Sequence, residues 1–504
     1  MANYIGQGWS AVMGIVFVPL YVSYLGIEAY GLIGLFALLQ AWLRLLDMGM
    51  TPTLVREMAR FTADGQEVAE IRDLLRSFEM ISIALAVLTA LTIGMRADWL
   101  AESWLRSGTL PTDTVAGAIT VMGTVAAIRF IESVYRSCLV GLQRQVTFNL
   151  INSGMATLRG VGAVAVLALV SPTVYAFFVW QGIVSIASLG MMALATYSSI
   201  HNGDRGGRFS TDSLRSVWQF AGGMLGINLL ALLLTQVDKI LLSKMLPLAD
   251  FGYYSLAAAA AGAIFMLVAP ITQAFYPRLT QLHASSNDAG MARAFHQGAQ
   301  MVTVMLGSAA VVLMFYSDTF LSIWTQDAVL TERTAPLLSL LVLGNLFNGL
   351  MWIPYQTQLA HGWTSLAMRI NLVAVAIIVP AILWVTPRYG AAGAGLIWCC
   401  LNAGYLTIAV HFMHRRILTK EKRYWYLQDV LQPLIAATLV VMLIRWSLPT
   451  PQNATQQLAS LIAATILALM ASILAAPLVR RQVGKAWISQ RIRVSQGSTE
   501  WTRL

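Results

Sequence analysis

The fold is decided by the stretch from Tyr24 to Arg60, which reads YLGIEAYGLIGLFALLQAWLRLLDMGMTPTLVREMAR. It begins as an apolar span long enough to cross a bilayer. Near the end of that span lie Gln40, Arg44 and Asp47, whose i, i+4, i+7 spacing places them on one face of a helix. A charge at membrane depth is costly when it faces lipid. We therefore expect this polar stripe to face a protein interior or a water-filled cavity, as one wall of a pathway.

Composition excludes a soluble protein. The chain has 504 residues, of which 57% are hydrophobic and only 11% are charged, and its mean hydropathy is +0.67. Soluble domains carry roughly 25% charged residues, so these values predict an all-α polytopic membrane protein. The net charge of +10 comes mainly from short loops between apolar spans, which the positive-inside rule explains without a nucleic-acid partner. No cysteine or histidine spacing indicates a metal site or another cofactor.

The chain holds about fourteen spans of the length that a bilayer requires. The expected spans are approximately 5–25, 28–48, 77–95, 114–137, 147–170, 173–197, 217–244, 250–275, 297–316, 335–358, 365–386, 390–412, 429–447 and 456–478. Between the second and third spans, apolar residues recur among charges and predict a helix lying at the membrane surface. These apolar residues are Leu54, Met58, Phe61, Ile71, Leu75 and Phe78.

Loop charge predicts the orientation. With the N-terminus inside, the inner loops and the C-terminal tail carry most of the lysines and arginines. The outer loops and outer span ends hold only Arg96, Arg106, Lys244, Arg333, Arg388 and Arg445. Since basic residues accumulate on the cytoplasmic side, we expect both termini to be cytoplasmic.

An internal repeat divides the chain. Leu25–Gly31 (LGIEAYG) and Leu246–Gly252 (LPLADFG) are offset by 221 residues and stand at equivalent span junctions. Parallel repeats of this kind are a transporter architecture with a site between the halves. The predicted domains are an N-terminal six-helix lobe at 1–200, a cytoplasmic linker at 201–216, a C-terminal six-helix lobe at 217–412, a basic cytoplasmic loop at 413–428, an additional helix pair at 429–478 and a cytoplasmic tail at 479–504.

Four further spans carry polar stripes. These stripes are Arg129, Glu132 and Arg136; Asn149, Asn152 and Arg159; Asn228, Thr235 and Asp238; and Asn345, Asn348, Trp352 and Tyr355. A structural interpretation exists for each. Arg44–Asp47 and Arg129–Glu132 would be ion pairs that hold helices in register, and the asparagines would form interhelical hydrogen bonds.

Charge balance favours function over a structural role. When Glu28 and Glu79 at span starts are left aside, the first lobe sets four arginines against two carboxylates. The excess of buried cation requires an anion such as a phosphorylated ligand. The residues concerned are Arg44, Arg129, Arg136 and Arg159 against Asp47 and Glu132. A mechanism coupled to H⁺ or Na⁺ would need a titratable carboxylate facing the cavity. The candidates are Asp47, Glu132 and Asp238, and the sequence does not choose among them.

VPLYVSYLGIEAYGLIGLF, followed by LLDMGMTPTLVREMAR, resembles the opening of the bacterial polysaccharide flippases of the Wzx type. The later stretch QVDKILLSKMLPLADFGYYSLA is similar to the repeat of the same family. The resemblance implies membership of the multidrug/oligosaccharidyl-lipid/polysaccharide exporter superfamily, with two six-helix bundles in a V around a central cavity. It departs from the family in having almost no residues before the first span, which puts an amphipathic N-terminal start in question.

The resemblance also implies a cargo, an oligosaccharide repeat unit of O-antigen, exopolysaccharide or capsule carried on undecaprenyl pyrophosphate. Arg44, Arg129, Arg136 and Arg159 would attract the phosphates, and the stripe from Asn345 to Tyr355 would contact sugars through Asn345, Asn348, Trp352 and Tyr355. Flipping between leaflets of the bacterial inner membrane makes no covalent bond, so no catalytic residue and no enzyme is expected. A polysaccharide polymerase or another assembly protein is an expected partner.

Two other functions remain open from the residues. A drug/cation antiporter of the same superfamily would require a more acidic cavity. A membrane polymerase or ligase would carry a large outer loop with catalytic arginines or histidines, and no outer loop here is long enough. The favoured prediction is therefore a flippase that works by alternating access and is driven by a cation gradient.

Overall fold

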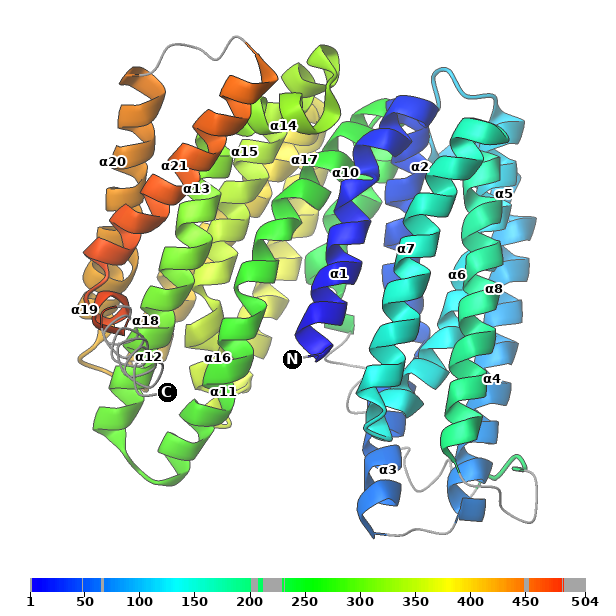
Figure 1. Ribbon diagram of the computed structural model, residues 1–504, viewed down its shortest axis with the longest axis horizontal. Helices are drawn as coiled ribbons and strands as arrows, with labels where there is room; N and C mark the ends of the chain where they lie inside the picture. The colour runs from blue at the N-terminus through cyan, green and yellow to red at the C-terminus, as the bar shows by residue number, and fades with distance from the viewer. Residues whose placement is uncertain are drawn as a thin grey trace, which may run out of the picture. The chain divides into compact units, whose positions relative to one another are not determined.

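The structure is a computed structural model of the 504-residue chain, all helical in its described part (Figure 1). It describes residues 2–47, 49–64, 68–200, 207–211, 229–230, 232–447, 453–482 and 484. Most of the predicted tail at 479–504, most of the linker at 201–216 and the first half of the span at 217–244 lie outside these ranges. Within them no β-strand occurs, and eleven helices are long and apolar enough to cross a membrane. The chain is therefore a multi-pass membrane protein.

The chain divides into two compact units. Unit 1 comprises Met1–Leu256 with Ile382–Ala391, and unit 2 comprises Ala257–Ala381 with Ala392–Leu504. The helices of unit 1 are α1 (Ala2–Val16), α2 (Val18–Leu46), α3 (Met50–Asp64), α4 (Val68–Met95), α5 (Ala97–Trp99), η1 (Leu100–Trp104), α6 (Thr112–Gly141), α7 (Gln145–Leu169), α8 (Val174–Ser199), residues 232–245 and most of α10 (Leu248–Gly262).

Unit 2 holds the remaining helices, including the predicted additional pair. They are η2 (Ala263–Leu267), α11 (Ala269–Ala284), α12 (Asp288–Val302), η3 (Thr303–Gly307), α13 (Ser308–Phe315), α14 (Ser317–Thr325), α15 (Ala328–Leu350), α16 (Trp352–Ala360), α17 (Ser365–Gly404), η4 (Tyr405–Ala409), α18 (Val410–His414), α19 (Lys422–Tyr424), η5 (Trp425–Leu431), α20 (Gln432–Ser447) and α21 (Ala454–Ala475). Part of α17 belongs to unit 1.

Two glycines divide long helices where the sequence predicts junctions between spans. Gly26 in α2 has φ 80° and ψ 164°, and Gly390 in α17 has φ 56° and ψ −144°. These conformations are accessible to glycine because it has no Cβ. The 50-residue helical stretch Ser365–His414 thus contains two predicted spans. The total of fourteen stays a prediction, because part of the seventh span lies outside the described residues.

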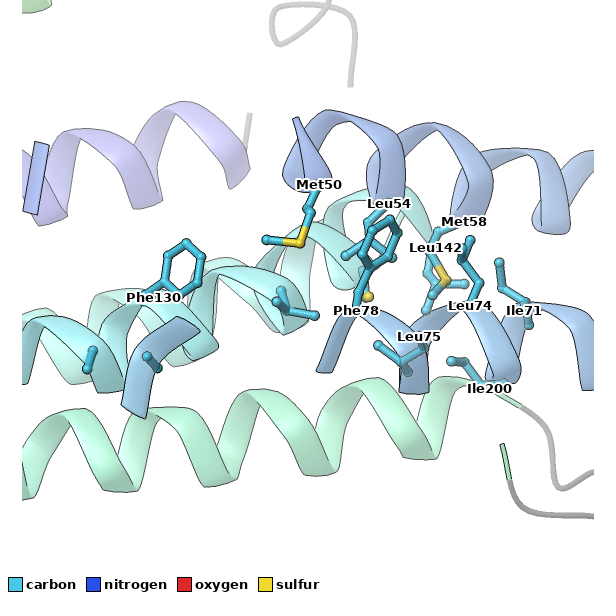
Figure 2. Packing of buried hydrophobic residues seen from close by; sticks show 14 residues of the cluster. Met50, Leu54, Met58, Ile71, Leu74, Leu75, Phe78, Phe130, Leu142 and Ile200 are labelled. Carbon is cyan, nitrogen blue, oxygen red and sulfur yellow. The ribbon is translucent and has the colours of Figure 1, made fainter. Parts of the chain in front are cut away.

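The predicted surface helix is wrong. α3 and the start of α4 form a helical hairpin whose apolar faces pack on each other and on α6 (Figure 2). Leu54, Met58 and Leu75 are fully buried, and Ile71 and Phe78 are only 2% and 3% exposed. Each such side chain stabilises the packed state by about 1.5–3 kcal/mol relative to exposure to water. The apolar pattern therefore reflects a protein core and not a lipid-facing surface.

The two copies of the internal repeat pack against each other within unit 1. A Cβ on Gly31 would lie 2.6 Å from the carbonyl oxygen of Leu248, and a Cβ on Gly252 would lie 2.3 Å from the carbonyl oxygen of Ile27. With the 221-residue offset, Gly31 corresponds to Gly252 and Ile27 to Leu248. The contact is therefore reciprocal, as an isologous interface about a two-fold axis requires.

The last two helices pack within unit 2. α13, α20 and α21 share one apolar cluster that includes fully buried Ala437, Val441, Ala464 and Ala468. Small side chains on the facing sides of helices allow the backbones to approach closely. At the end of α20, Arg445 Nη2 lies 2.7 Å from Asp318 Oδ2 of α14.

Candidate functional site

A pocket of about 790 Å³ lies within unit 1 and contains all four arginines that the sequence singles out. Its charged lining residues are Arg44, Asp47, Arg129, Glu132, Arg136 and Arg159. α2, α6 and α7 supply these charges, and residues 232–236 add neutral side chains. We call it the cation pocket. The predicted polar stripes of three spans thus face one shared cavity.

Arg129 is held by neutral partners. Its Nε donates to Ser185 Oγ at 3.1 Å, and its two terminal nitrogens donate to Gln40 Oε1 and Gln181 Oε1, each at 2.8 Å. Its guanidinium carbon also lies 5.0 Å from the ring centroid of Phe36. These contacts use three of the five guanidinium N–H groups. They fix the orientation of the fork and leave its positive charge without a carboxylate partner among the described residues.

Arg159 forms the ion pair of the cation pocket. Its Nη2 lies 3.3 Å from Glu132 Oε2, and the other oxygen of Glu132 accepts a hydrogen bond from Ser188 at 2.8 Å. The two side chains are 21% and 12% exposed. The Arg159–Glu132 pair joins α7 to α6, and Ser188 adds α8. Glu132 therefore pairs with Arg159, and the structural alternative of an Arg129–Glu132 ion pair is not found among the described residues.

Arg44 and Arg136 are the less constrained cations. Both side chains are exposed and line the pocket. Neither forms a hydrogen bond or ion pair with a described residue; the guanidinium carbon of Arg136 lies 5.0 Å from the ring centroid of Phe148. The predicted Arg44–Asp47 ion pair is likewise absent from the described part of the chain. Two arginine guanidinium groups therefore line the cavity with N–H donors that no described residue accepts from.

Asp47 caps a helix instead. Its carboxylate accepts from the backbone N–H of Thr51 at 3.0 Å and from the Thr51 hydroxyl at 2.7 Å. A side chain that accepts from the first free N–H groups stabilises the start of a helix, here α3. The described charges of the cation pocket are thus four arginines against two carboxylates. The excess is two positive charges, and both carboxylates already have hydrogen-bond partners.

Asp238 lies outside this lining, on the helical residues 232–245. Its Oδ2 accepts from the hydroxyl of Tyr254 at 2.7 Å, whereas its buried Oδ1 has no hydrogen-bond partner among the described residues. The side chain is in the buried class at 8% exposed. Since neighbouring Lys239 donates to Thr235 and Gln236, no described cation neutralises Asp238.

The predicted sugar-contact stripe belongs to unit 2, where it forms a connected network. Asn345 donates to the Ala261 carbonyl at 2.9 Å and accepts from Trp398 at 2.9 Å, and Asn348 donates to Asn402 at 2.8 Å. Trp352 donates to Asn348 and stacks on Phe265 with a centroid distance of 5.4 Å. Only Tyr355, 43% exposed, has no side-chain hydrogen bond to a described residue.

Family comparison agrees with this geometry. A family model described as "Polysaccharide biosynthesis protein" matches residues 1–283, more than half of the chain. The chain belongs to this family. The membership confirms the Wzx-type polysaccharide flippase family that the opening residues resemble. A second model, described as MatE, matches residues 224–385 of this family member.

The relatives of this polysaccharide biosynthesis family member are transporters. Over 374 residues it is 19% identical to the "Putative O-antigen transporter" of Shigella flexneri, which covers 74% of the chain and 87% of that relative. The solved structure of the lipid II flippase MurJ in an inward closed conformation matches with a TM-score of 0.69 and 13% identity, covering 94% of this chain and 98% of that one.

A multidrug resistance MATE family transporter of the MOP superfamily, in an inward-facing conformation, matches with a TM-score of 0.61 and 14% identity. That match covers 82% of the family member and 96% of the transporter. At such identities the likeness concerns the fold, and it confirms the predicted fold class. With the family match, it makes the chain a membrane transporter of this superfamily.

Sequence reasoning missed the side chains of this family member that support the cation pocket from behind its lining. Gln181, Ser185 and Ser188 of α8 hold Arg129 and Glu132. Their i, i+4, i+7 spacing within an apolar span is the same signal that marks Gln40, Arg44 and Asp47. A search for uncharged polar stripes would have found it.

Proposed function

We propose that the chain is a flippase for oligosaccharide repeat units linked to undecaprenyl pyrophosphate. The observation that carries the proposal is the cation pocket, in which four arginines outnumber two carboxylates. A pyrophosphate supplies the missing negative charge, and arginine forks match phosphate oxygens in bidentate geometry. The pocket volume of about 790 Å³ is in the range of small-molecule sites, and it suits a head group and not a whole lipid.

The four arginines have distinct roles in this proposal. Arg44 and Arg136 bind the phosphates directly, because their donors are free of protein carboxylates among the described residues. Arg129 contributes a fixed positive charge whose orientation Gln40 and Gln181 set. Arg159 contributes through the donors that Glu132 does not engage, while Glu132 limits its charge. In unit 2, Tyr355 is the candidate with an exposed ring for sugar contact, whereas Asn345, Asn348 and Trp352 would first have to exchange their mutual hydrogen bonds.

For the coupling cation, H⁺ or Na⁺, Asp238 is the strongest of the three predicted carboxylates. Its Oδ1 is buried without a partner in the described part of the chain, so a bound cation or proton would satisfy it. Glu132 and Asp47 are already engaged by Arg159 and Thr51. Under the proposal, flipping by Asp238→Asn loses its response to an imposed ion gradient.

The proposal places the protein in the bacterial cytoplasmic membrane, with both termini cytoplasmic, as loop charge predicts. The repeat unit is turned from the cytoplasmic to the outer leaflet by alternating access, and no covalent bond is made. A polysaccharide polymerase or assembly protein would then receive the flipped unit.

The test is a flipping assay in proteoliposomes with a fluorescent undecaprenyl-pyrophosphate oligosaccharide. Arg44→Gln and Arg136→Gln should each reduce flipping or head-group affinity by about tenfold or more, because each removes a charge-assisted contact. Arg44→Lys should fall between wild type and Arg44→Gln, since lysine keeps the charge but loses the fork. Arg293→Gln, at an exposed position of α12 outside the pocket, is the matched control and should flip normally.

Wild-type rates in Arg44→Gln and Arg136→Gln would show that the phosphate site lies elsewhere. A second function, drug/cation antiport, has the support of the MatE match over residues 224–385. If the wild type fails to flip the lipid but exports organic cations from the same vesicles, antiport replaces flipping as the function. The basic pocket predicts the opposite result.

A further inference from the structure

Unit 2 contains a buried cluster of titratable groups that the proposed function does not use. His296 of α12 lies between two carboxylates: its Nδ1 is 2.5 Å from Asp429 Oδ2, and its Nε2 is 3.1 Å from Glu421 Oε2. The side chains of His296 and Asp429 are 8% and 0% exposed, and that of Glu421 is 34% exposed. No motif in the sequence marks this arrangement, because His296 is more than a hundred residues from Glu421 and Asp429.

The two contacts need more protons than the neutral groups can supply. A neutral imidazole has one N–H donor and one bare nitrogen acceptor, and ionised carboxylates only accept. Hydrogen bonds from both ring nitrogens to carboxylate oxygens therefore require an imidazolium, or else a protonated carboxyl group. In either case the cluster holds one proton beyond a neutral ring and two carboxylates. We propose that His296, Asp429 and Glu421 form a proton-binding site.

The surroundings of the site set its charge. From α18, the ring of His414 packs edge-on against that of Phe295, and its Nδ1 donates to the Leu418 carbonyl at 2.9 Å. From α19, Lys422 contacts His411 at 2.7 Å, and the ring of Tyr424 lies 4.5 Å from that of His296. Among the described residues no lysine or arginine forms an ion pair with Asp429 or Glu421, and the two carboxylates depend on the bound proton for compensation.

The site joins the last helix pair to the rest of unit 2. Asp429 belongs to η5, at the start of the thirteenth predicted span, and Gln300 of α12 donates to its second oxygen at 2.8 Å. Gln300 in turn accepts from the backbone N–H of Leu478, beyond α21, at 2.9 Å. Loss of the proton leaves two carboxylates beside a neutral ring, one contact without a hydrogen, and like charges that repel. Proton occupancy therefore controls how firmly α12 holds α19 and η5.

The opposite end of α20 provides an internal reference. There Arg445 binds Asp318 at 2.7 Å and lies 5.0 Å from the ring centroid of Tyr316. The guanidinium stays charged at every accessible pH. We expect only the end of α20 that adjoins η5, where Asp429 contacts His296, to loosen as the pH rises.

The presence of the bound proton is tested directly by ¹⁵N NMR of the histidine rings in the full-length protein in nanodiscs. The variant His296→Gln assigns the His296 signal. Near pH 7, His296 should show two protonated ring nitrogens, or one with its proton strongly shared with Asp429. It should pass to the neutral form only on alkalinisation. A free, neutral ring near pH 7 would overturn the proposal. His361→Gln, at the ring contact with His283, is the control and should leave the His296 signal unchanged.

Hydrogen exchange tests the consequence. After correction for intrinsic exchange, amides of residues 421–431 should exchange about tenfold faster near pH 9 than near pH 6. In His296→Gln they should exchange fast at both pH values, while Asp318→Asn should keep the wild-type response. If the exchange rates of these amides still depend on pH in His296→Gln, the His296 site does not control them. If His296→Gln does not fold, Glu421→Gln, at the more exposed partner, replaces it and should reduce the response. Neither assay depends on flipping, so the result stands apart from the proposed function.

Discussion

At the residue scale, the cation pocket separates arginines by what holds them. Arg129 is fixed by three neutral side chains and Arg159 by one carboxylate, whereas Arg44 and Arg136 have no such partner among the described residues. A buried guanidinium must have its donors satisfied, because an unpaired buried polar group costs more than a hydrogen bond gains. Glutamine carbonyls satisfy Arg129 without cancelling its charge. The pocket thereby keeps a fixed cation that an anion can use.

Gln181→Leu tests this role. The change leaves one N–H pair of Arg129 without its acceptor and should lower stability by about 1–3 kcal/mol. It should also weaken pyrophosphate binding, because the fork is no longer oriented. Thermal unfolding in detergent and head-group binding measure the two effects. Gln281→Leu, at an exposed position of α11, is the control and should change neither. An unaltered melting temperature for Gln181→Leu would mean that water replaces the glutamine.

At the scale of elements, the reciprocal contact between the repeat copies depends on glycines, which have no side chain. A Cβ at Gly31 or Gly252 meets a backbone carbonyl oxygen, which cannot rotate away. At Gly34 a Cβ would meet the side chain of Ser255, which can move. The offset of 221 residues relates Gly34 to Ser255, so this pair lies where the two copies cross. The two repeat copies therefore form a close helix–helix contact in addition to being similar in sequence.

Gly252→Ala should separate α10 from the part of α2 that follows Gly26 and destabilise unit 1 by about 1–3 kcal/mol, as overpacking does. Gly31→Ala should act similarly, since the contact is reciprocal, and Gly34→Ala should cost less. Gly117→Ala in α6 is the matched control, because nothing lies within 4 Å of its Cβ position and alanine favours a helix. Unfolding in detergent, followed by circular dichroism, compares the four variants. Equal stability of Gly252→Ala and Gly117→Ala would contradict the close contact.

At the scale of the whole molecule, charge distribution predicts which loops face the cytoplasm. The loop between α11 and α12 counts as inner and the loop before α21 as outer, because basic residues concentrate in the former set. Both loops offer exposed positions, Ser286 and Asn453. Their accessibility from the two sides of the membrane is a property that no single helix determines.

Single cysteines test the orientation in a Cys400→Ser background, since Cys400 is the exposed native cysteine while Cys138 and Cys399 are buried. In intact cells, Asn453→Cys should react with a membrane-impermeant maleimide and Ser286→Cys should not. In inside-out vesicles the pattern should reverse. Labelling of Ser286→Cys in intact cells would place the termini outside and invert the proposed direction of transport.

The sequence by itself determined the membrane class, the helical fold, the span junctions at Gly26 and Gly390 and the family. These follow from local quantities: apolar length, loop charge, glycine position and short motifs, which each segment carries without its neighbours. It also singled out the four arginines of the cation pocket, because a charge in an apolar span is conspicuous. It did not determine which charged side chains form ion pairs with each other. Whether Glu132 pairs with Arg129, one turn away, or with Arg159 on another helix depends on how the helices face each other.

Tertiary structure likewise decided that the apolar face of α3 is core. Amphipathic periodicity is the same for a helix that packs on protein and one that lies on lipid, and only the positions of α4 and α6 distinguish them. The same holds for His296, which is separated from Glu421 and Asp429 by more than a hundred residues in the chain and meets them only in the fold. Sequence determines what each helix can bury, and packing determines which charges meet.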